Sequence, residues 1–559
     1  MKGRITITSA TLVIAIGMGL LGPTVRAAGG LTMTSFSPAS GPVGTMVTIS
    51  GTGFVANDIV RFNGTTAAVA GVNAAATVLT TSVPYGATSG IITVTDPTTG
   101  QTVGLPNSPF TVTRGIFPSP RSVWAGGSFT LFGSALSPDR TDPIGIGALT
   151  VGRVTTDRLG NFQIGVSVPW SLTSGQWQLW VVDPIFNKVI TIIFVLGDWP
   201  EYRHDTSLSG YDTFESSLTP TSVAGLKQLW SKTTDPAAVW AMEPSVANGL
   251  VYEGFNESGN GNFYAFTTDG KTIKWSVGLY AQQLGAAPAI ANGVLYLVTG
   301  SSFGPVLYAM NAATGAPIWN RYIGSASGSA LSAPAVVGTS VYIGTRDGNL
   351  LALKTSTGAT EWSFAAGAAI DASPAVAGGI VYVASKNGIL WAVNATTGKK
   401  VWVAYGAEGD GSAAVVGGVV YSGIVNGYVE ALKASTGARL WINGFGGNAV
   451  FRTSPAVVKG IVYIGFDTTA AAGGILAAMN ATSGVVNWTQ IVGPGITDAA
   501  VADGVVYCAS TTGNLVRAIN TSTAAILWHT SAVAAPNAPI ISNGIVFLEG
   551  KNNIYAFSL

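Results

Sequence analysis

The chain has 559 residues, of which 47% are hydrophobic and 9% are charged, and its formal net charge is +1. An average soluble domain carries about 25% charged residues. With so few charges and a net charge near zero, the chain has no basic surface that would favour binding to nucleic acid. Cys508 is the single cysteine, which excludes an intramolecular disulfide, so stability must come from a large hydrophobic core.

The first 27 residues predict a secretory signal peptide. Lys2 and Arg4 precede an apolar stretch over residues 12–21, and the small residue Ala27 suits a cleavage site. A transmembrane anchor is the alternative, but the stretch is shorter than the ~20 residues that span a bilayer. No cysteine lies near the cleavage point, which argues against a lipid anchor. We expect an extracellular or cell-surface protein, periplasmic in a Gram-negative host, with no transmembrane segment in the mature chain.

Two β-rich units are predicted between the leader and the repeats. Residues 31–112 contain the strings FSPASGPVGTMVTISGTG (36–53) and VRFNG (60–64), in which Pro and Gly mark turns between short alternating strands. This unit resembles the immunoglobulin-like IPT/TIG domains. Residues 113–197 have their own strand pattern, including GGSFTLFG (126–133), and are similar to a second immunoglobulin-like module. A lead-in segment, residues 198–225, follows.

The remainder of the chain, residues 226–559, repeats one unit eight times. Two aromatic series are in phase, and the first has a spacing of 39 to 47 residues, the period of a four-stranded propeller blade. Tight-turn pairs such as Asn248-Gly249 precede the second series and predict hairpins. The first series is Trp230, Trp275, Trp319, Trp362, Trp402, Trp441, Trp488 and Trp528. The second series is Tyr252, Tyr296, Tyr342, Tyr382, Tyr421, Tyr463, Tyr507 and Phe547.

The two ends of this region complete each other. Residues 226–231 form a lone Trp strand, whereas residues 539–559 have three strands and end before their Trp strand. Pairing the two would close the ring and hide two sheet edges. We therefore predict an all-β protein, with an eight-bladed closed β-propeller after two immunoglobulin-like β-sandwiches. The Trp rings are expected to pack between blades rather than to bind a ligand.

The amino-acid pattern of the repeat resembles the pyrroloquinoline-quinone-like (PQQ-like) propeller repeats. The matching strings are NAATGAPIW (311–319), NATTGKKVW (394–402), KASTGARLW (433–441) and NATSGVVNW (480–488). The lead-in DWPEYRHDTSLSGYD (198–212) is similar to segments that precede such propellers. The resemblance implies either a quinoprotein dehydrogenase or a non-enzymatic scaffold of outer-membrane assembly. Many of the dehydrogenases carry adjacent cysteines over the cofactor, which this chain cannot supply.

Enzyme signatures are weak. The string Gly300-Ser301-Ser302-Phe303-Gly304 matches a nucleophile elbow, but it falls on a predicted propeller hairpin rather than on a strand-to-helix turn. Only two histidines, His204 and His529, are present, so ordinary triads and multi-histidine metal sites are excluded. Cys508 follows Tyr507 within a predicted strand and is expected to be a buried thiol rather than a nucleophile.

One set of charged residues is a candidate ligand site. In a chain with few charges, five of the eight units place a charged residue just before the innermost strand, which a propeller points toward one mouth of its central channel. Carboxylates could hold a cation and a guanidinium could orient a polar ligand. The alternative is that they are solvated residues at a rim. The residues are Glu243, Asp371, Asp410, Arg452 and Asp498.

These observations favour an exported, non-catalytic surface or envelope protein whose propeller is a scaffold for an unidentified protein or glycan. No catalytic residue, metal or cofactor is predicted. The first alternative is a divergent quinone-dependent alcohol or sugar dehydrogenase, which would require PQQ with Ca²⁺. The second is carbohydrate or cell-wall binding through exposed aromatics such as Trp240, Tyr280 or Phe303.

Overall fold

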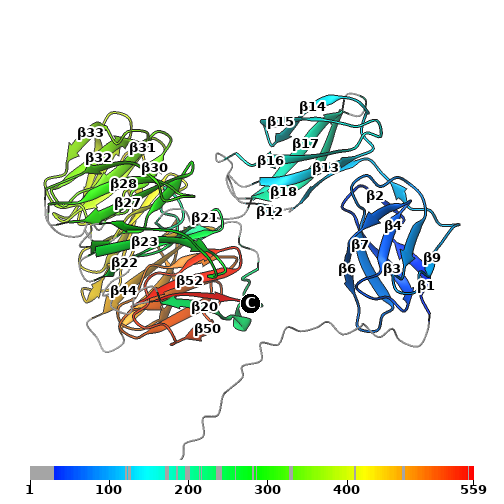
Figure 1. The fold of residues 1–559 in the computed structure, drawn as a ribbon. Coiled ribbons are helices and arrows are strands. Elements are labelled where there is room, and N and C mark those ends of the chain that lie inside the picture. Colours follow the sequence, from blue (N-terminus) through cyan, green and yellow to red (C-terminus); the bar gives the residue numbers. More distant parts are fainter. Residues whose placement is uncertain are drawn as a thin grey trace, which may run out of the picture. The chain divides into compact units, whose positions relative to one another are not determined.

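The computed structural model describes residues 30–559 except 120–121, 124–127, 170–174, 184, 186, 196–201, 213–214, 216, 234–241, 258–259, 280–282, 285, 302, 326–331, 408–410, 469–472 and 552. The predicted signal peptide lies outside this part. The described chain is all-β, as predicted, with one short 3-10 helix, η1 (Val223–Gly225) (Figure 1). None of its helices is long and apolar enough to cross a membrane. The chain forms two compact units, and the second contains the propeller.

The first module is a sandwich of two antiparallel sheets. Strands such as β3 alternate buried and exposed residues, so that each sheet turns one face toward the shared core. Val47, Ile49, Val60 and Phe62 are fully buried there. One sheet has the order β1 (Thr32–Ser37), β3 (Met46–Thr52), β7 (Val78–Ser82), β6 (Val69–Val72). The other has the order β5 (Thr65–Ala67), β4 (Ile59–Phe62), β8 (Ile92–Thr95), β9 (Thr102–Gly104).

The second module also has two sheets. Leu131 from one sheet, and Ile144 and Val181 from the other, are fully buried. The smaller sheet has the order β11 (Gly115–Ser119), β13 (Ser128–Ser134), β16 (Phe162–Ser167). The larger has the order β12 (Ser122–Val123), β18 (Asn187–Val195), β17 (Gly175–Asp183), β14 (Thr141–Ile146), β15 (Leu149–Thr155).

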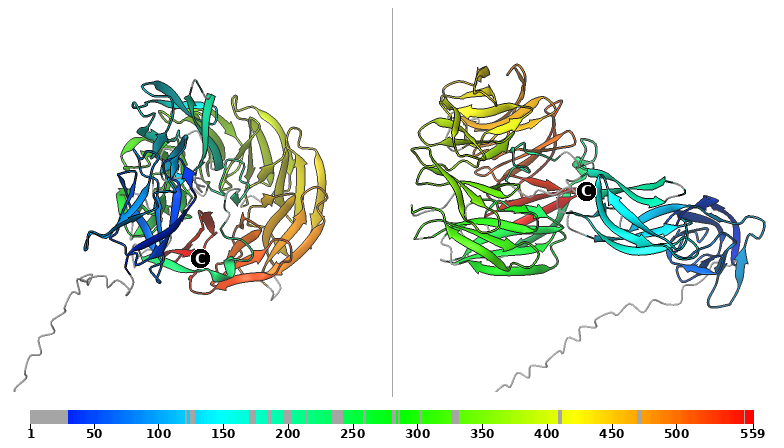
Figure 2. Two further views of the ribbon diagram at one scale, coloured as in Figure 1. Left: turned by 90° about the vertical axis from the view of Figure 1, so that its right-hand side faces the viewer. Right: turned by 90° about the horizontal axis from the view of Figure 1, so that it is seen from above.

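Eight sheets make up the propeller within the described part of residues 202–559, the same number as the recurring Trp residues. Innermost strands that follow one another along the chain are neighbours in space, so the sheets follow one another around a ring (Figure 2). The innermost strands are β21 (Ser245–Ala247), β26 (Ala289–Ala291), β30 (Ala335–Val337), β34 (Ala375–Ala377), β38 (Ala414–Val416), β43 (Ala456–Val458), β47 (Ala500–Ala502) and β51 (Ile540–Ser542). The second strands are β22 (Leu250–Glu257), β27 (Val294–Gly300), β31 (Ser340–Gly344), β35 (Ile380–Ser385), β39 (Val419–Ile424), β44 (Ile461–Thr468), β48 (Val505–Ser510) and β52 (Ile545–Gly550).

The third and outermost strands complete each blade. The third strands are β23 (Asn260–Thr267), β28 (Val306–Asn311), β32 (Asn349–Lys354), β36 (Ile389–Asn394), β40 (Tyr428–Lys433), β45 (Gly474–Asn480), β49 (Leu515–Asn520) and β53 (Asn553–Ser558). The outermost are β24 (Ile273–Leu279), β29 (Pro317–Tyr322), β33 (Thr360–Ala365), β37 (Lys400–Tyr405), β41 (Arg439–Gly444), β46 (Val486–Ile491), β50 (Ile526–Thr530) and β20 (Lys227–Thr233).

The recurring Trp residues join neighbouring blades, as predicted. Each indole N–H donates to a backbone carbonyl in the turn of the next blade, at 2.8 to 3.0 Å. At six of these junctions the ring also lies against the glycine of that turn: a Cβ on Gly437 would lie 2.8 Å from the Trp402 ring. The acceptors are the carbonyls of Thr268, Ala312, Thr355, Ala395, Ala434, Ala481, Thr521 and Leu226.

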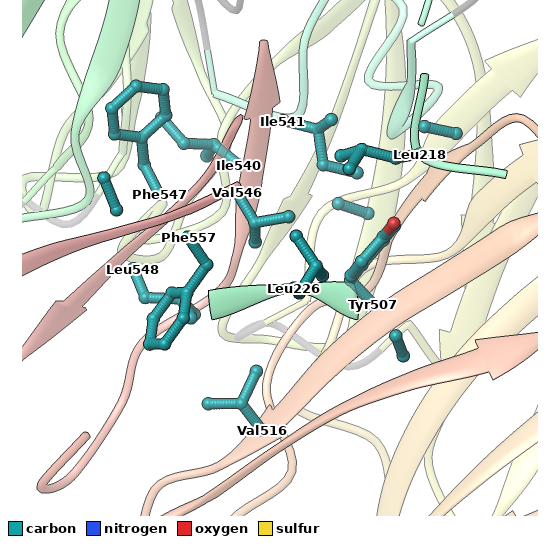
Figure 3. Packing of buried hydrophobic residues seen from close by; sticks show 14 of the residues in the cluster. Leu218, Leu226, Tyr507, Val516, Ile540, Ile541, Val546, Phe547, Leu548 and Phe557 are labelled. Atoms are coloured by element: carbon teal, nitrogen blue, oxygen red, sulfur yellow. The ribbon is translucent and has the colours of Figure 1, made fainter. Parts of the chain in front are cut away.

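The ring closes through pairing of the two ends of the repeat region. β20 pairs antiparallel with β53, with Lys227 opposite Ser558 and Thr233 opposite Asn553. The predicted closing strand is therefore confirmed. Leu226 and Leu218 extend the seam, because they are buried in one hydrophobic cluster with residues of β48 and β51 (Figure 3).

Candidate functional site

The described part of the lead-in segment, within residues 202–225, lies against the innermost strands of several successive blades. The central valine of each of four innermost strands donates its backbone N–H to a lead-in carbonyl, and β19 (Tyr211–Asp212) then pairs in parallel with β47. These bonds satisfy donors on the free edges of those strands from within the chain itself. The four bonds are Val376 to Thr206 (2.6 Å), Val415 to Ser207 (2.9 Å), Val457 to Ser209 (2.9 Å) and Val501 to Gly210 (2.9 Å).

Asp205 shapes the lead-in locally. Its carboxylate accepts hydrogen bonds from Ser207 N (2.9 Å), Ser207 Oγ (2.7 Å), Ser209 N (3.1 Å) and Ser209 Oγ. Although burial opposes it, the neighbouring His204 and these serines hold the pKa of Asp205 well below its usual range. Arg203, His204 and Leu208 have φ of 57°, 80° and 58°. A left-handed backbone is energetically unfavourable for residues other than glycine, and the contacts around Asp205 stabilise it here.

A hydrogen-bond relay runs around the ring beside the lead-in. The relay position lies three residues before the central residue of the innermost strand, and each backbone N–H donates to the side chain at the same position of the next blade. The relay ends at the Asp498 carboxylate. Its bonds are Ala333 N to Ser373 Oγ (2.9 Å), Ser373 N to Ser412 Oγ (2.8 Å), Ser412 N to Ser454 Oγ (3.1 Å) and Ser454 N to Asp498 Oδ1 (2.7 Å).

Asp498 also holds the start of the lead-in. Tyr202 Oη donates to Asp498 Oδ2, and Arg203 Nη1 lies 3.4 Å from that oxygen. The Arg203 side chain is only 3% exposed, yet its Nε and Nη2 have no hydrogen-bond partner among the described residues. The ion pair is therefore buried, so removing one partner would leave an uncompensated charge.

Glu243 lies at the relay position of another blade and lines one small cavity with Asp498, Tyr202 and Arg203. The cavity measures about 10 Å³, close to the minimum that accommodates one water molecule. Burial raises the pKa of Glu243 to about 8; the charge of Asp498 adds to this, and Arg203 opposes it. Burial, followed by the charge of Asp498, also raises the pKa of Tyr202.

Two of the remaining candidates, Asp371 and Arg452, do not join this cluster. Asp371 pairs with Arg346 (3.1 Å) and Lys386 (3.5 Å). Arg452 is exposed, and Asp410 lies outside the described residues. The five residues were predicted to share one register, but Asp371 and Arg452 stand five residues before the central valine, whereas Glu243 and Asp498 stand three before it. The two sets therefore lie at different positions in the segments that lead into the innermost strands.

Sequence reasoning missed Tyr202, Arg203 and the relay serines. A signal for the serines was present, because SPAV (373–376), SAAV (412–415), SPAV (454–457) and DAAV (498–501) align when the central valine is used as the reference. No comparable signal marks Tyr202 or Arg203, because the lead-in is not a repeat. Their place follows from contacts with blades that lie far away in sequence.

The cluster does not fit a quinone cofactor with Ca²⁺. Asp498 and Asp371 are already paired with side chains of the chain, and the cavity at Glu243 is smaller than any organic cofactor. Within the described residues, no group of three or more His, Cys, Asp or Glu side chains is arranged to hold a metal ion.

Two family models match the chain. The family described as outer membrane protein assembly factor BamB matches residues 221–334, 302–443 and 425–558, which together extend over more than half of the chain. The chain belongs to this family. The IPT/TIG domain model matches residues 31–112. Both resemblances stated from the sequence, to PQQ-like propeller repeats and to the IPT/TIG domain, are confirmed.

Solved structures resemble this BamB-like chain in fold. BamB from Moraxella catarrhalis is 19% identical, with a TM-score of 0.50 over 60% of this chain and 98% of that chain. A europium-containing methanol dehydrogenase is 14% identical, with a TM-score of 0.54 over 65% and 98%. The quinohemoprotein alcohol dehydrogenase from Comamonas testosteroni is 15% identical, with a TM-score of 0.53 over 65% and 80%. At these identities the likeness shows the fold alone. No curated protein matches in sequence.

The weak enzyme signatures have structural explanations. The Gly300–Gly304 string connects β27 and β28, and Ser301 Oγ donates to the carbonyl of Gly304 at 2.6 Å, so it is a hairpin turn as expected. Cys508 is fully buried, and burial raises the pKa of its thiol to about 12, which leaves it protonated and inert. Of the three aromatics considered for glycans, Phe303 is 80% exposed, and Trp240 and Tyr280 lie outside the described residues.

Proposed function

We propose that this chain is an exported, non-catalytic protein of the cell surface or envelope, and that its propeller is a scaffold for a protein or glycan partner. The predicted signal peptide, the BamB-like repeats and the IPT/TIG module support export and an envelope or extracellular setting. The immunoglobulin-like modules would present the propeller to its partner.

The proposal that the protein is non-catalytic rests on the charged residues near the innermost strands. These residues make structural contacts within the chain. A catalytic carboxylate must be free to meet a substrate, a metal or a cofactor. Asp498 instead anchors Tyr202, Arg203 and Ser454, and Asp371 is paired with Arg346 and Lys386. Asp498 therefore holds the lead-in against the blades, and Asp371 makes ion pairs within and between neighbouring blades.

One experiment tests both parts. The full chain is expressed in a bacterial host, its location is determined by cell fractionation, and its first residue is determined by mass spectrometry. The recovered mature protein is then unfolded thermally with and without PQQ and Ca²⁺, because a ligand that binds only the folded state raises the unfolding midpoint. We expect recovery outside the cytoplasm, cleavage after residue 27, and an unchanged midpoint.

Two results would overturn the proposal separately. Recovery of an uncleaved chain in the cytoplasm would contradict export. A rise in midpoint that requires both PQQ and Ca²⁺, is lost in Glu243→Gln and persists in the exposed control Arg452→Ala would instead support the divergent dehydrogenase.

A further inference from the structure

A second pocket lies between the blades that contain β46 and β47, away from the Glu243 cavity. Its volume is about 420 Å³, within the ~300–1,000 Å³ typical of small-molecule sites. We call it the Trp488 pocket. Its aromatic residues are Tyr211, Tyr463 and Trp488, and its polar residues include Lys459, Asn487 and Ser522.

The aromatic wall is fixed in place. Trp488 Nε1 donates to the carbonyl of Thr521 at 2.9 Å, and the Trp488 and Tyr463 rings lie 5.9 Å apart between centroids. With the indole N–H already used, the part of Trp488 that meets the pocket is its apolar ring. Tyr211 comes from β19, which pairs with β47. The lead-in therefore builds part of this pocket.

The turn beside Trp488 differs from the turns at six other junctions. There a glycine lies against the Trp ring, and a Cβ on it would come within 2.5 to 2.8 Å of ring carbons. The residue at this turn is Ala524, whose N–H donates to Asn520 O as Gly484 N–H does to Asn480 O, and whose φ is 59°. The turn beside Trp488 therefore carries a methyl group where the other six have none. The glycines are Gly270, Gly315, Gly358, Gly398, Gly437 and Gly484.

Lys459 has no structural explanation in the fold. It is exposed, its φ is 46°, and it stands at a hairpin position that is Gly, Asn or Asp in the other seven blades. Those residues are favoured there because they tolerate positive φ, which lysine does not. Within the described residues it has no carboxylate partner. An unfavourable residue at a strained backbone position without a packing role points to a function.

We propose that the Trp488 pocket binds a sugar that carries a carboxylate, such as a uronic acid. The C–H face of a pyranose ring would stack on Trp488 while its hydroxyls bond to Asn487 and Ser522, and the carboxylate would pair with Lys459. The axis of the propeller plays no part, so this inference stands whether or not the proposed scaffold function holds.

Calorimetric titration of the full mature chain tests this inference. The probes are glucuronate, glucose, which has the ring without the charge, and gluconate, which has the charge without the ring. We expect glucuronate to bind most tightly. Lys459→Gly should weaken glucuronate up to about fivefold, the upper value for one exposed ion pair, and should leave glucose unchanged. This variant keeps the fold, because glycine suits the turn.

Matched variants separate the pocket from general effects. Lys433→Ala removes the same charge from an exposed position outside the pocket, and Thr482→Ala is the counterpart of Ser522→Ala at the preceding junction. Asn487→Ala and Ser522→Ala should weaken glucuronate and glucose alike, and both controls should bind as the wild type does. Absence of binding, equal affinity for gluconate and glucuronate, or equal affinity for glucose and glucuronate with no effect of Lys459→Gly would each overturn the inference.

Discussion

At the scale of single residues, Asp498 occupies the relay position that serine holds in the three preceding blades. A serine could accept the hydrogen bond from Ser454 N, but it could not also balance the buried charge of Arg203 and accept from Tyr202. Glu243 holds the same position without a hydrogen-bond partner among the described residues. Its carboxyl is therefore held in its neutral form over a wide pH range.

Glu243 makes stability depend on pH in a predictable direction. Because its pKa is about 8 in the folded chain and 4.5 ordinarily, the folded state binds more protons between these values, and its free energy of unfolding falls as pH rises. Glu243→Gln should remove this loss. Measured by urea unfolding, the variant should gain more than about 1 kcal/mol relative to wild type between pH 5 and pH 8.

The exposed Glu361 provides the control for Glu243. In Glu361→Gln, the difference in free energy of unfolding from the wild type should stay nearly constant over the same range. The pH argument would be wrong if Glu243→Gln behaved like Glu361→Gln.

At the scale of elements, six junctions between neighbouring blades place a Trp ring over a glycine turn. The turn needs a positive φ, and the ring needs the absence of a Cβ, so the glycine serves two purposes. Gly417 serves only the first of these purposes, because its φ is 61° but a Cβ on it would have no neighbour within 4 Å.

Gly437→Ala should therefore destabilise the propeller more than Gly417→Ala. Both substitutions carry about 1–2 kcal/mol of left-handed strain, and Gly437→Ala adds about 1–3 kcal/mol for overpacking against Trp402. Chemical unfolding of the two variants isolates the ring contact as their difference. Equal losses would show that the Trp ring moves aside without cost.

At the scale of the whole molecule, β20 closes the ring without chain continuity to its sheet partner. β53 belongs to the other end of the repeat region, so only hydrogen bonds and packing hold β20 in its blade. Trp230 reinforces this seam through Thr268 and contacts with Phe266 and Phe547. The other outermost strands, such as β29, are tethered by short turns.

Trp230→Ala should open the seam. Both Trp230→Ala and Trp319→Ala lose about 3–5 kcal/mol of packing. Only Trp230→Ala loosens β20, which is far in sequence from its partner β53, so that re-forming the pair requires closing a very long loop. Hydrogen exchange should accelerate throughout β20 and β53 in Trp230→Ala and stay local to β29 and its neighbours in Trp319→Ala. Protection of β20 equal to that in the wild type would contradict this account.

Blade architecture is local and periodic, so it could be predicted from the amino-acid sequence alone. The Trp period, the paired turn residues and the incomplete first and last units predicted a propeller with a closing strand, because each signal reflects contacts within one blade or between adjacent blades. Which charged groups come into contact depends instead on the folded arrangement of the blades and the lead-in. Glu243 and Asp371 look equivalent along the chain, but a two-residue difference in register places one beside Arg203 and the other beside Arg346 and Lys386. Tyr202, Arg203 and Tyr211 reach their places through a non-repeating lead-in, whose long-range contacts no local period encodes.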